Sequence, residues 1–134
     1  MTTTIELETE LRAFFEGYAR TFHADLDRFC GHFHFPSTTV RLDGTLEVLR
    51  TKEEALDFWA SAKQLYEEEG CTHWAIKRLA AVPLGAGSAT ATIDWAMLRA
   101  DDSSIRGWTQ TYNVIGSAHG WHVLLSTLHV GSES

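Results

Sequence analysis

Four polar side chains stand within otherwise apolar helical or β-rich segments, where they could hydrogen-bond a carbonyl group or move a proton. Tyr18 lies in an apolar helical stripe, and a phenol in a dry pocket donates a hydrogen bond to a carbonyl oxygen as it becomes an enolate. Gln110 offers an amide donor that needs no raised pKa. His129 carries an imidazole, a group suited to act as an acid or a base, and Asp94 is a carboxylate in a β-rich run, where acids are uncommon. These residue types point to carbonyl binding or acid–base chemistry.

Each of these side chains also has an ordinary structural interpretation. Tyr18 fits a core position with its hydroxyl satisfied by backbone. Gln110 fits a hydrogen bond to a neighbouring side chain across a sheet. His129 fits a structural position near the end of the last strand. The sequence leaves both interpretations open for all three residues.

The sequence offers little for metal or cofactor chemistry. His32 and His34 have a spacing that metal sites use, but a zinc-type site needs further ligands and nothing near in sequence supplies one. A glycine-rich phosphate loop, a Cys-x-x-Cys pair and a nucleophile elbow are all lacking. We therefore expect no metal and no cofactor. Cys30 and Cys71 are expected to be reduced thiols that pack as small hydrophobes.

Length, composition and charge limit the class of protein. The 134 residues, 44% of them hydrophobic and 22% charged, predict a single globular domain over residues 1–134. The formal net charge of −7 disfavours nucleic acid and anionic membrane surfaces as partners. The first residues have neither a basic stretch nor an apolar core, so no signal peptide is expected and the cytoplasm is the expected compartment.

The elements that must position the polar residues begin with helices. Thr3 and Glu6 form a capping-box pattern ahead of an apolar stripe that runs from Leu7 to Phe22. Asp25 is a good N-cap for a short second helix, which is expected to carry Phe33 on its apolar face and to end at Pro36. A third amphipathic helix is expected after the Thr51 and Glu54 capping box, with Gly70 just beyond its end.

The remaining chain is expected to form strands. Residues 38–42 and 45–49 form a hairpin around the Asp43-Gly44 turn signal. Residues 72–82, 88–100, 105–115 and 121–130 form an antiparallel meander, with Pro83 closing the first of these strands. Helices followed by a long sheet predict an α+β fold, a curved sheet wrapped on three N-terminal helices. Such a cone is a natural small-molecule cavity.

Alternation along the strands predicts which side chains face the cavity. The inward sets include Trp95 and Met97 of one strand and Trp108, Gln110 and Tyr112 of the next. In the last strand the inward set is Trp121, Val123, Leu125, Thr127 and His129. Asp94 is then expected to point outward, and a β-bulge would turn it inward as a general base. The aromatic residues expected to contact a ligand are Phe22, Trp59, Trp95, Trp108, Tyr112 and Trp121.

The order of elements and particular residues resemble the nuclear transport factor 2-like superfamily, and within it the SnoaL-like polyketide cyclase and ketosteroid isomerase group. The resemblance rests on the stretch from Tyr18 to Asp27 with its Asp-Leu-Asp opening of helix two, and on the late motif Gly120-Trp121-His122-Val123. It covers essentially the whole chain and implies a cone-shaped, cystatin-like α+β barrel with a curved sheet that is antiparallel or mixed. The superfold hosts isomerases, dehydratases, cyclases, hydrolases and plain binders.

The resemblance also implies roles for particular residues. Tyr18 falls where ketosteroid isomerases keep an oxyanion-hole tyrosine, and Gln110 falls where they keep a second donor. The position of their general base is occupied here by Leu42, with Asp43 one residue away in the expected turn. His129 matches the late-strand acid or base of related cyclases and dehydratases.

Three functions are therefore compatible with the sequence. The first is a binder of a small apolar or aromatic carbonyl ligand, the second a cofactor-independent acid–base enzyme, and the third a dimeric interaction module with a filled core. Whether the chain is an enzyme stays open. A homodimer through the outer face of the sheet is expected in each case, because the residues assigned to that face are mostly small or apolar.

Overall fold

The computed structural model describes residues 4–117 and 120–131. The chain forms helices and strands in the expected order, with these bounds: α1 Thr4–Ala24, α2 Leu26–Cys30, β1 Phe33–Val40, β2 Leu46–Leu49, α3 Lys52–Glu68, β3 His73–Gly85, β4 Ser88–Leu98, β5 Ser104–Ser117 and β6 Gly120–Leu128. The predicted cap at Thr3 lies outside the described residues.

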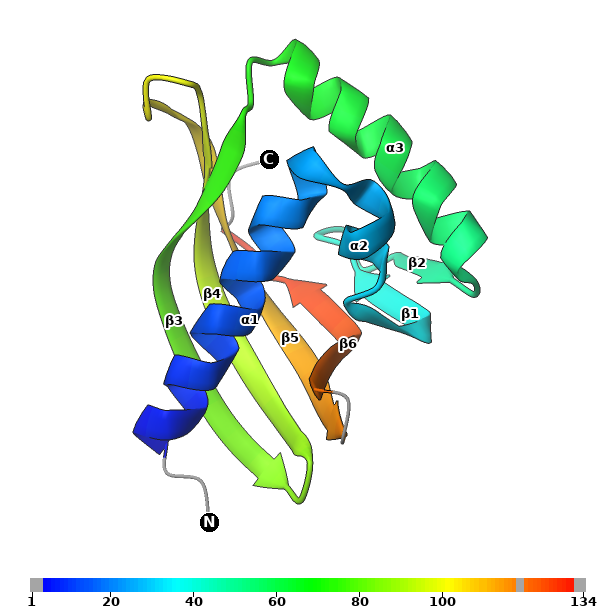
Figure 1. Cartoon of the computed structure of the whole chain (residues 1–134), viewed down its shortest axis with the longest axis vertical. Coiled ribbons are helices and arrows are strands. Elements are labelled where there is room, and N and C mark those ends of the chain that lie inside the picture. The colour runs from blue at the N-terminus through cyan, green and yellow to red at the C-terminus, as the bar shows by residue number, and fades with distance from the viewer. Residues whose placement is uncertain (1–3, 118–119, 132–134) are drawn as a thin grey trace.

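Helix α1 supplies the central apolar ridge of the core. Its stripe Leu7, Leu11, Phe15, Tyr18 and Phe22 is buried, as the periodicity predicts. The helix lies across one face of the sheet, with α2 beside its C-terminal part and α3 beyond α2 (Figure 1). The carboxylate of Asp25 accepts a hydrogen bond from the Arg28 backbone N–H at 3.2 Å, which confirms the predicted N-cap of α2.

The prediction for the end of the second helix was wrong. Helix α2 ends at Cys30, and Phe33 and Pro36 belong to β1 instead. Pro36 is tolerated there because the β1–β2 ladder begins only at Ser37 and the β1–β6 register shifts between Phe33 and Thr38. A residue without an N–H therefore interrupts no ladder hydrogen bond.

The predicted turn between β1 and β2 is present but longer than two residues. The strands pair antiparallel from Ser37↔Leu49 to Val40↔Leu46, which leaves residues 41–45 in the connection. Gly44 adopts φ +84°, a conformation that favours glycine. The Asp43 carboxylate accepts hydrogen bonds from the backbone N–H and the hydroxyl of Thr45. The turn residues thus lie where the sequence predicts them.

The six strands form one open, mixed sheet in the order β2-β1-β6-β5-β4-β3 within the described residues. The pair β1–β6 is parallel and the other pairs are antiparallel, which confirms the predicted meander of β3 to β6. Strand β3 continues past the predicted end at Val82 to Gly85, and Pro83 lies within it. A proline is compatible with β3 because β3 is an edge strand.

A bulge in β6 reverses the predicted faces in the second half of that strand. Asn113 pairs with Leu125 and Val114 pairs with Val123, so Leu124 is the extra residue. Before the bulge Val123 is buried as predicted, but after it Ser126 is buried and Leu128 lines the pocket described below. Leu125, Thr127 and His129, which were expected inside, therefore lie on the outer face. The predicted inward set of β4 from Ala89 to Met97 is buried as expected.

Candidate functional site

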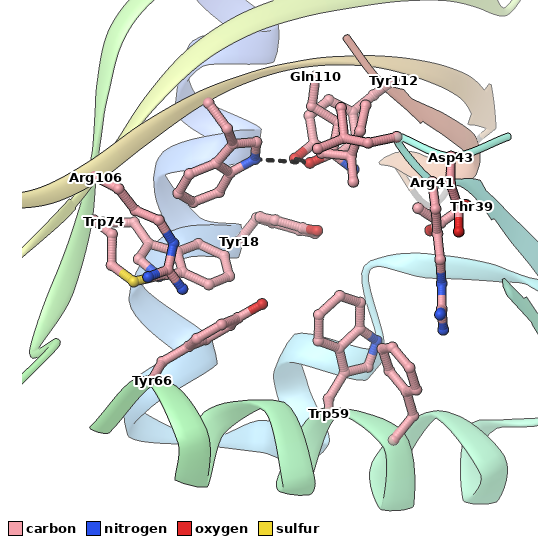
Figure 2. Close-up of a pocket in the computed structure, with 15 residues that line it drawn as sticks. Tyr18, Thr39, Arg41, Asp43, Trp59, Tyr66, Trp74, Arg106, Gln110 and Tyr112 are labelled. Carbon is pink, nitrogen blue, oxygen red and sulfur yellow. Dashed lines mark hydrogen bonds between the residues drawn. The ribbon is translucent and has the colours of Figure 1, made fainter. Parts of the chain in front are cut away.

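A cavity of about 500 Å³ lies between α1, α3, the β1–β2 connection and the inner face of β3 to β6. Figure 2 shows aromatic side chains reaching it from opposite sides, with Tyr18 entering from α1, Trp59 and Tyr66 from α3, and Trp74 from the sheet. Trp108, Gln110 and Tyr112 line it from β5. Its size lies within the range of about 300–1,000 Å³ typical of small-molecule sites.

The aromatic wall is two layers deep on the sheet side. Trp108 lines the cavity and stacks on Trp95 with ring centroids 6.1 Å apart and an interplanar angle of 25°. Trp95 is 2% exposed and also stacks on Tyr18 at 6.2 Å. Trp95 therefore supports the wall from behind, and Trp108 is the ring of this pair that faces the cavity.

A chain of hydrogen bonds fixes the polar end of the cavity. The Tyr112 hydroxyl accepts a hydrogen bond from Trp95 Nε1–H at 2.8 Å and donates one to Gln110 Oε1 at 3.0 Å. Gln110 Oε1 also accepts from Trp108 Nε1–H at 3.0 Å, and Gln110 Nε2 donates to Ser126 Oγ at 2.8 Å. These partners determine the orientation of the amide, with both oxygen lone pairs engaged and one of the two N–H groups left over.

The phenols of the cavity remain neutral at physiological pH. Burial raises the pKa of Tyr18 well above its usual value, and the neighbouring Tyr112 raises it further. Burial likewise raises the pKa of Tyr66. The Tyr18 and Tyr66 hydroxyls point into the cavity (Figure 2). Both side chains therefore bring a protonated hydroxyl, which is a hydrogen-bond donor, to the site.

Charged groups line the cavity where none was expected. The sequence predicted Tyr18, Tyr112 and His129 as the ionisable residues inside, but Arg41, Arg106 and Asp43 also line it. Arg106 binds both carboxylate oxygens of Glu69, with Nη2–Oε1 at 2.9 Å, and lies over the Tyr66 ring at 5.7 Å. Arg41 pairs with Glu47.

Asp43 is the carboxylate adjacent in the chain to Leu42, the position at which a general base was sought in the sequence. It lines the cavity from the β1–β2 connection, next to Leu42, which also lines it. The hydrogen bonds from Thr45 lower the pKa of Asp43. Asp43 is thus exposed, ionised and a weak base.

His129 lies away from the cavity, which corrects its predicted orientation. Its Nε2 lies 2.6 Å from the hydroxyl of Thr111, and Thr111 in turn hydrogen-bonds Thr92 at 2.8 Å. Both threonines belong to the outer face of the sheet, and the β6 bulge carries His129 onto the same face. His129 can therefore reach no group bound in the cavity.

Asp94 points outward as the alternation predicts. Its carboxylate accepts a hydrogen bond from Thr109 at 2.7 Å and pairs with Arg78 Nε at 3.2 Å. The register shifts beside β4 place the extra residues in β3 and β5, so β4 alternates without interruption and the alternative of an inward Asp94 does not arise.

Three of the expected ligand-contacting aromatic residues lie outside the cavity lining: Phe22, Trp121 and Trp95, which lies behind Trp108. Phe22 is fully buried behind Trp74, with the rings stacked at 4.3 Å. Trp121 packs on Gly116, and its indole N–H donates to Glu10 at 3.4 Å. Trp59, Trp108 and Tyr112 line the cavity as predicted.

Several residues that line the cavity were not among the predicted site residues: Thr39, Arg41, Phe58, Tyr66, Trp74, Met97, Arg106 and Leu128. Of these, Met97 was placed inside without a role, and alternation in residues 72–82 would have placed Trp74 on the same face as Ile76. Leu128 could not be found, because the bulge that turns it inward has no sequence signature.

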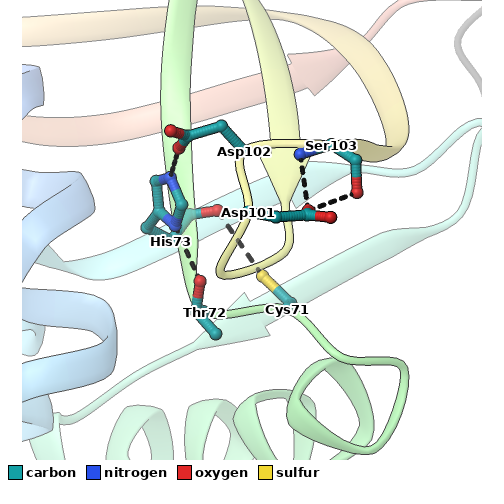
Figure 3. Close-up of polar contacts among 6 residues, drawn as sticks. All are labelled: Cys71, Thr72, His73, Asp101, Asp102 and Ser103. Atoms are coloured by element: carbon teal, nitrogen blue, oxygen red, sulfur yellow. Dashed lines mark hydrogen bonds and ion pairs between the residues drawn. The ribbon is translucent and has the colours of Figure 1, made fainter.

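A second polar cluster joins the start of β3 to the β4–β5 turn (Figure 3). His73 Nδ1 lies 2.7 Å from the Thr72 hydroxyl, and His73 Nε2 lies 2.7 Å from the Asp102 carboxylate. This order resembles a nucleophile–base–acid chain, but the side chains of His73 and Asp102 are 42% and 79% exposed and none of the three lines the cavity. The cluster therefore serves to anchor the turn, where Asp102 adopts φ +68°.

Among the described residues, His, Cys, Asp and Glu side chains form no group of three that could hold a metal ion. In the same residues, no helix combines the length and the apolar character needed to cross a bilayer.

Comparison with known proteins identifies the fold and leaves the ligand open. Residues 8–130 match the family described as NTF2-like protein (DUF6841). No curated protein matches the sequence.

Solved structures share the architecture at low sequence identity. Aln2 from a Streptomyces species superposes with a TM-score of 0.75 at 10% identity, covering 96% of this chain and 94% of that one. An NTF2-like protein with a cystatin-like fold from Novosphingobium aromaticivorans gives 0.72 at 14% identity, covering 96% and 85%. The yeast UBP3-associated protein BRE5 gives 0.69 at 12% identity, covering 92% and 95%. At these identities the likeness concerns the fold alone.

Proposed function

This chain belongs to the NTF2-like protein family (DUF6841), and from that premise we propose that it binds a small, flat, acceptor-bearing aromatic molecule in the cavity. An aromatic ketone or a polyketide-like ring is the chemical class that fits. The proposal rests on one observation: neutral hydrogen-bond donors and aromatic side chains line the same open cavity.

The donors and the walls complement one kind of ligand. Tyr18 and Tyr66 present protonated hydroxyls, and Gln110 retains one N–H group beyond its bond to Ser126. A carbonyl or phenol oxygen accepts such bonds. The indole of Trp108 offers a flat face, on which stacking adds about 1 kcal/mol beyond burial of area.

The charges of the cavity support a neutral ligand. Arg41 and Arg106 line the cavity, but each is already paired with a carboxylate, Arg41 with Glu47 and Arg106 with Glu69. The Asp43 carboxylate in turn accepts hydrogen bonds from Thr45. A charged ligand would have to compete with these partners, whereas a neutral acceptor would not.

Acid–base catalysis is the second candidate, and Asp43 is the observation that favours it. Asp43 lines the same cavity as Tyr18 and Gln110, so a base and two donors face one ligand. Its lowered pKa makes it a poor general base at neutral pH. Binding without chemistry therefore has the better support, and the open cavity argues against a filled-core interaction module.

The proposal is tested by a ligand screen that uses tryptophan emission as the reporter. Aromatic ketones, phenols, steroids and aromatic ammonium compounds are titrated into the protein, and each bound ketone is then incubated and checked for isomerised or cyclised product. Saturable binding of neutral carbonyl compounds without turnover is expected. Turnover that is lost in Asp43→Asn would favour the enzyme, and binding restricted to the ammonium compounds would overturn the proposal.

A further inference from the structure

A cleft on the helical side of the molecule gathers basic side chains from three helices. It measures about 480 Å³ and shares no lining residue with the aromatic cavity. Arg20 comes from α1, Arg28 from α2 and Lys52 from the first turn of α3. Figure 1 shows α2 lying between the C-terminal part of α1 and α3, which brings these positions together.

The positive charge of the cleft is largely uncompensated. Asp27 is the acidic residue of its lining, and the Lys52 ammonium holds that carboxylate at 3.1 Å. Within the described part of the chain, Arg20 and Arg28 take part in no ion pair. Two guanidinium groups therefore remain available in a protein whose net charge is −7. Their combined charge matches a dianion.

Gly17, in the interior of α1, is one of the residues that line the cleft. Glycine is the least favourable residue after proline in a helix interior. A methyl group at this position would meet only Arg20 Nη2 at 3.7 Å and His32 Nε2 at 4.0 Å, which are ordinary contacts. Packing within the chain therefore gives no reason for a glycine here. A ligand group that closely approaches the helix backbone at Gly17 would explain the glycine, because a methyl group there would occupy the position of the ligand.

The two side chains nearest to Gly17 show which groups point at this part of the cleft. The Arg20 guanidinium and the His32 ring converge on the space over Gly17. His32 Nδ1–H donates to the Phe29 carbonyl at 3.0 Å, which leaves Nε2 facing the cleft. In neutral His32 this nitrogen accepts a hydrogen bond, and a phosphate oxygen that carries a proton can donate it.

We propose that this cleft binds a phosphate group, held by the guanidinium groups of Arg20 and Arg28 and seated over Gly17. A phosphate carries about −1.5 to −2 at pH 7, and planar guanidinium forks bind its oxygens in pairs. The group can be free phosphate or the end of a small phosphate monoester.

The test titrates ¹⁵N-labelled full-length protein with inorganic phosphate, glycerol phosphate and acetate at fixed ionic strength, and follows backbone amide shifts. Saturable shifts at Gly17, Thr21 and Gly31 are expected with both phosphates, and about tenfold weaker ones with acetate. Equal response to acetate, or shifts spread over the whole surface, would overturn the proposal. A response to glycerol phosphate well above that to free phosphate would identify a monoester as the ligand.

Three variants and a matched control sharpen the test. Arg20→Gln and Arg28→Gln should each weaken phosphate binding about tenfold, whereas Arg12→Gln, two turns earlier on α1, should leave it unchanged. Gly17→Ala should raise the thermal midpoint by about 2–5 °C, since alanine favours the helix, and should still weaken phosphate binding at least fivefold. Unchanged binding in a stabilised Gly17→Ala variant would overturn the proposal without any question of misfolding.

Discussion

At the scale of single residues, Tyr18 shows how far chemistry can be inferred from residue type. Its position in an apolar stripe predicted burial, and its likeness to an oxyanion-hole tyrosine predicted a hydroxyl directed at a cavity. The two interpretations turn out to be compatible. The ring is 3% exposed, while the hydroxyl points into the cavity (Figure 2).

Removal of the Tyr18 hydroxyl should weaken ligand binding without loss of fold. Tyr18→Phe keeps the ring contacts with Phe29 and Trp95 and removes a donor. Affinity for an aromatic ketone should fall about three- to tenfold, the effect of one neutral hydrogen bond. Titration by tryptophan emission measures it, with Trp121→Phe as the control, because Trp121 lies outside the cavity lining. Equal affinity in Tyr18→Phe would exclude a hydrogen bond from this residue.

Gln110 contributes to stability as well as to the site. Gln110→Leu would leave the Tyr112 hydroxyl and the Trp108 indole N–H without their shared acceptor. The free energy of unfolding should fall by about 1–3 kcal/mol, as measured by urea denaturation. Gln64→Leu, the same change on the exposed side of α3, is the control and should change it by less than about 0.5 kcal/mol. A Gln110→Leu variant as stable as the parent would show that the network contributes nothing.

Because of Cys30, the stability of the protein should depend on pH in the alkaline range. Burial raises its pKa to about 11 from 9.0, so the folded state favours the neutral thiol. The stabilisation is complete below pH 9 and is lost as the pH rises from 9 to 11. The free energy of unfolding should therefore fall by about 2–3 kcal/mol over this window. Denaturation at several pH values measures it, and in Cys30→Ala the slope between pH 9 and 11 should be shallower. An identical slope in both proteins would assign the effect to the buried tyrosines.

At the scale of elements, caps and turns could be predicted, and strand irregularities could not. Asp25 and Thr51 carry side-chain oxygens that bind backbone N–H groups three residues on, so their signal is local in sequence. The β6 bulge depends on how Asn113 and Val114 pair with a strand that follows them, and no residue type marks it. This is why Trp108, Gln110 and Tyr112 were placed correctly while His129 and Leu128 were reversed.

A salt bridge ties the end of α3 to the sheet, and its removal should have only a local effect. Arg106 on β5 binds Glu69, which directly follows α3, in a bidentate pair. In Glu69→Gln, hydrogen exchange of the amides from Tyr66 to Glu69 should accelerate, while global stability falls by no more than about 1 kcal/mol. Glu68→Gln is the control and should leave exchange unchanged. Uniformly faster exchange across the whole chain would contradict a local role.

At the scale of the whole molecule, no helix or strand within the described residues packs on the outer face of the sheet (Figure 1). The bulge removes Leu128 from this face and places Leu125 on it. Two polar ladders cross the strands of the face, Arg78–Asp94–Thr109 and Thr92–Thr111–His129. Asn113, which faces Thr90 on β4, has a buried side-chain oxygen without a hydrogen-bond partner in the part of the chain that the structure describes. A buried acceptor of this kind is costly unless a donor reaches it.

We expect a second copy of the chain to pack on the outer face, with the two sheets face to face about a twofold axis. A twofold interface meets its own surface, so threonine and asparagine side chains on one copy can serve those on the other. The strong net charge of −7 does not oppose this, since Arg78 and Asp94 compensate each other on this face. Light scattering at micromolar concentration should give twice the chain mass of 15.0 kDa. Thr111→Arg, in the middle of the face, should shift the population to monomer, because two guanidinium groups would meet across the axis. Gln64→Arg adds the same charge on the exposed side of α3 and should leave the dimer intact. A 15.0 kDa species in the parent protein would show that the outer face is solvated instead.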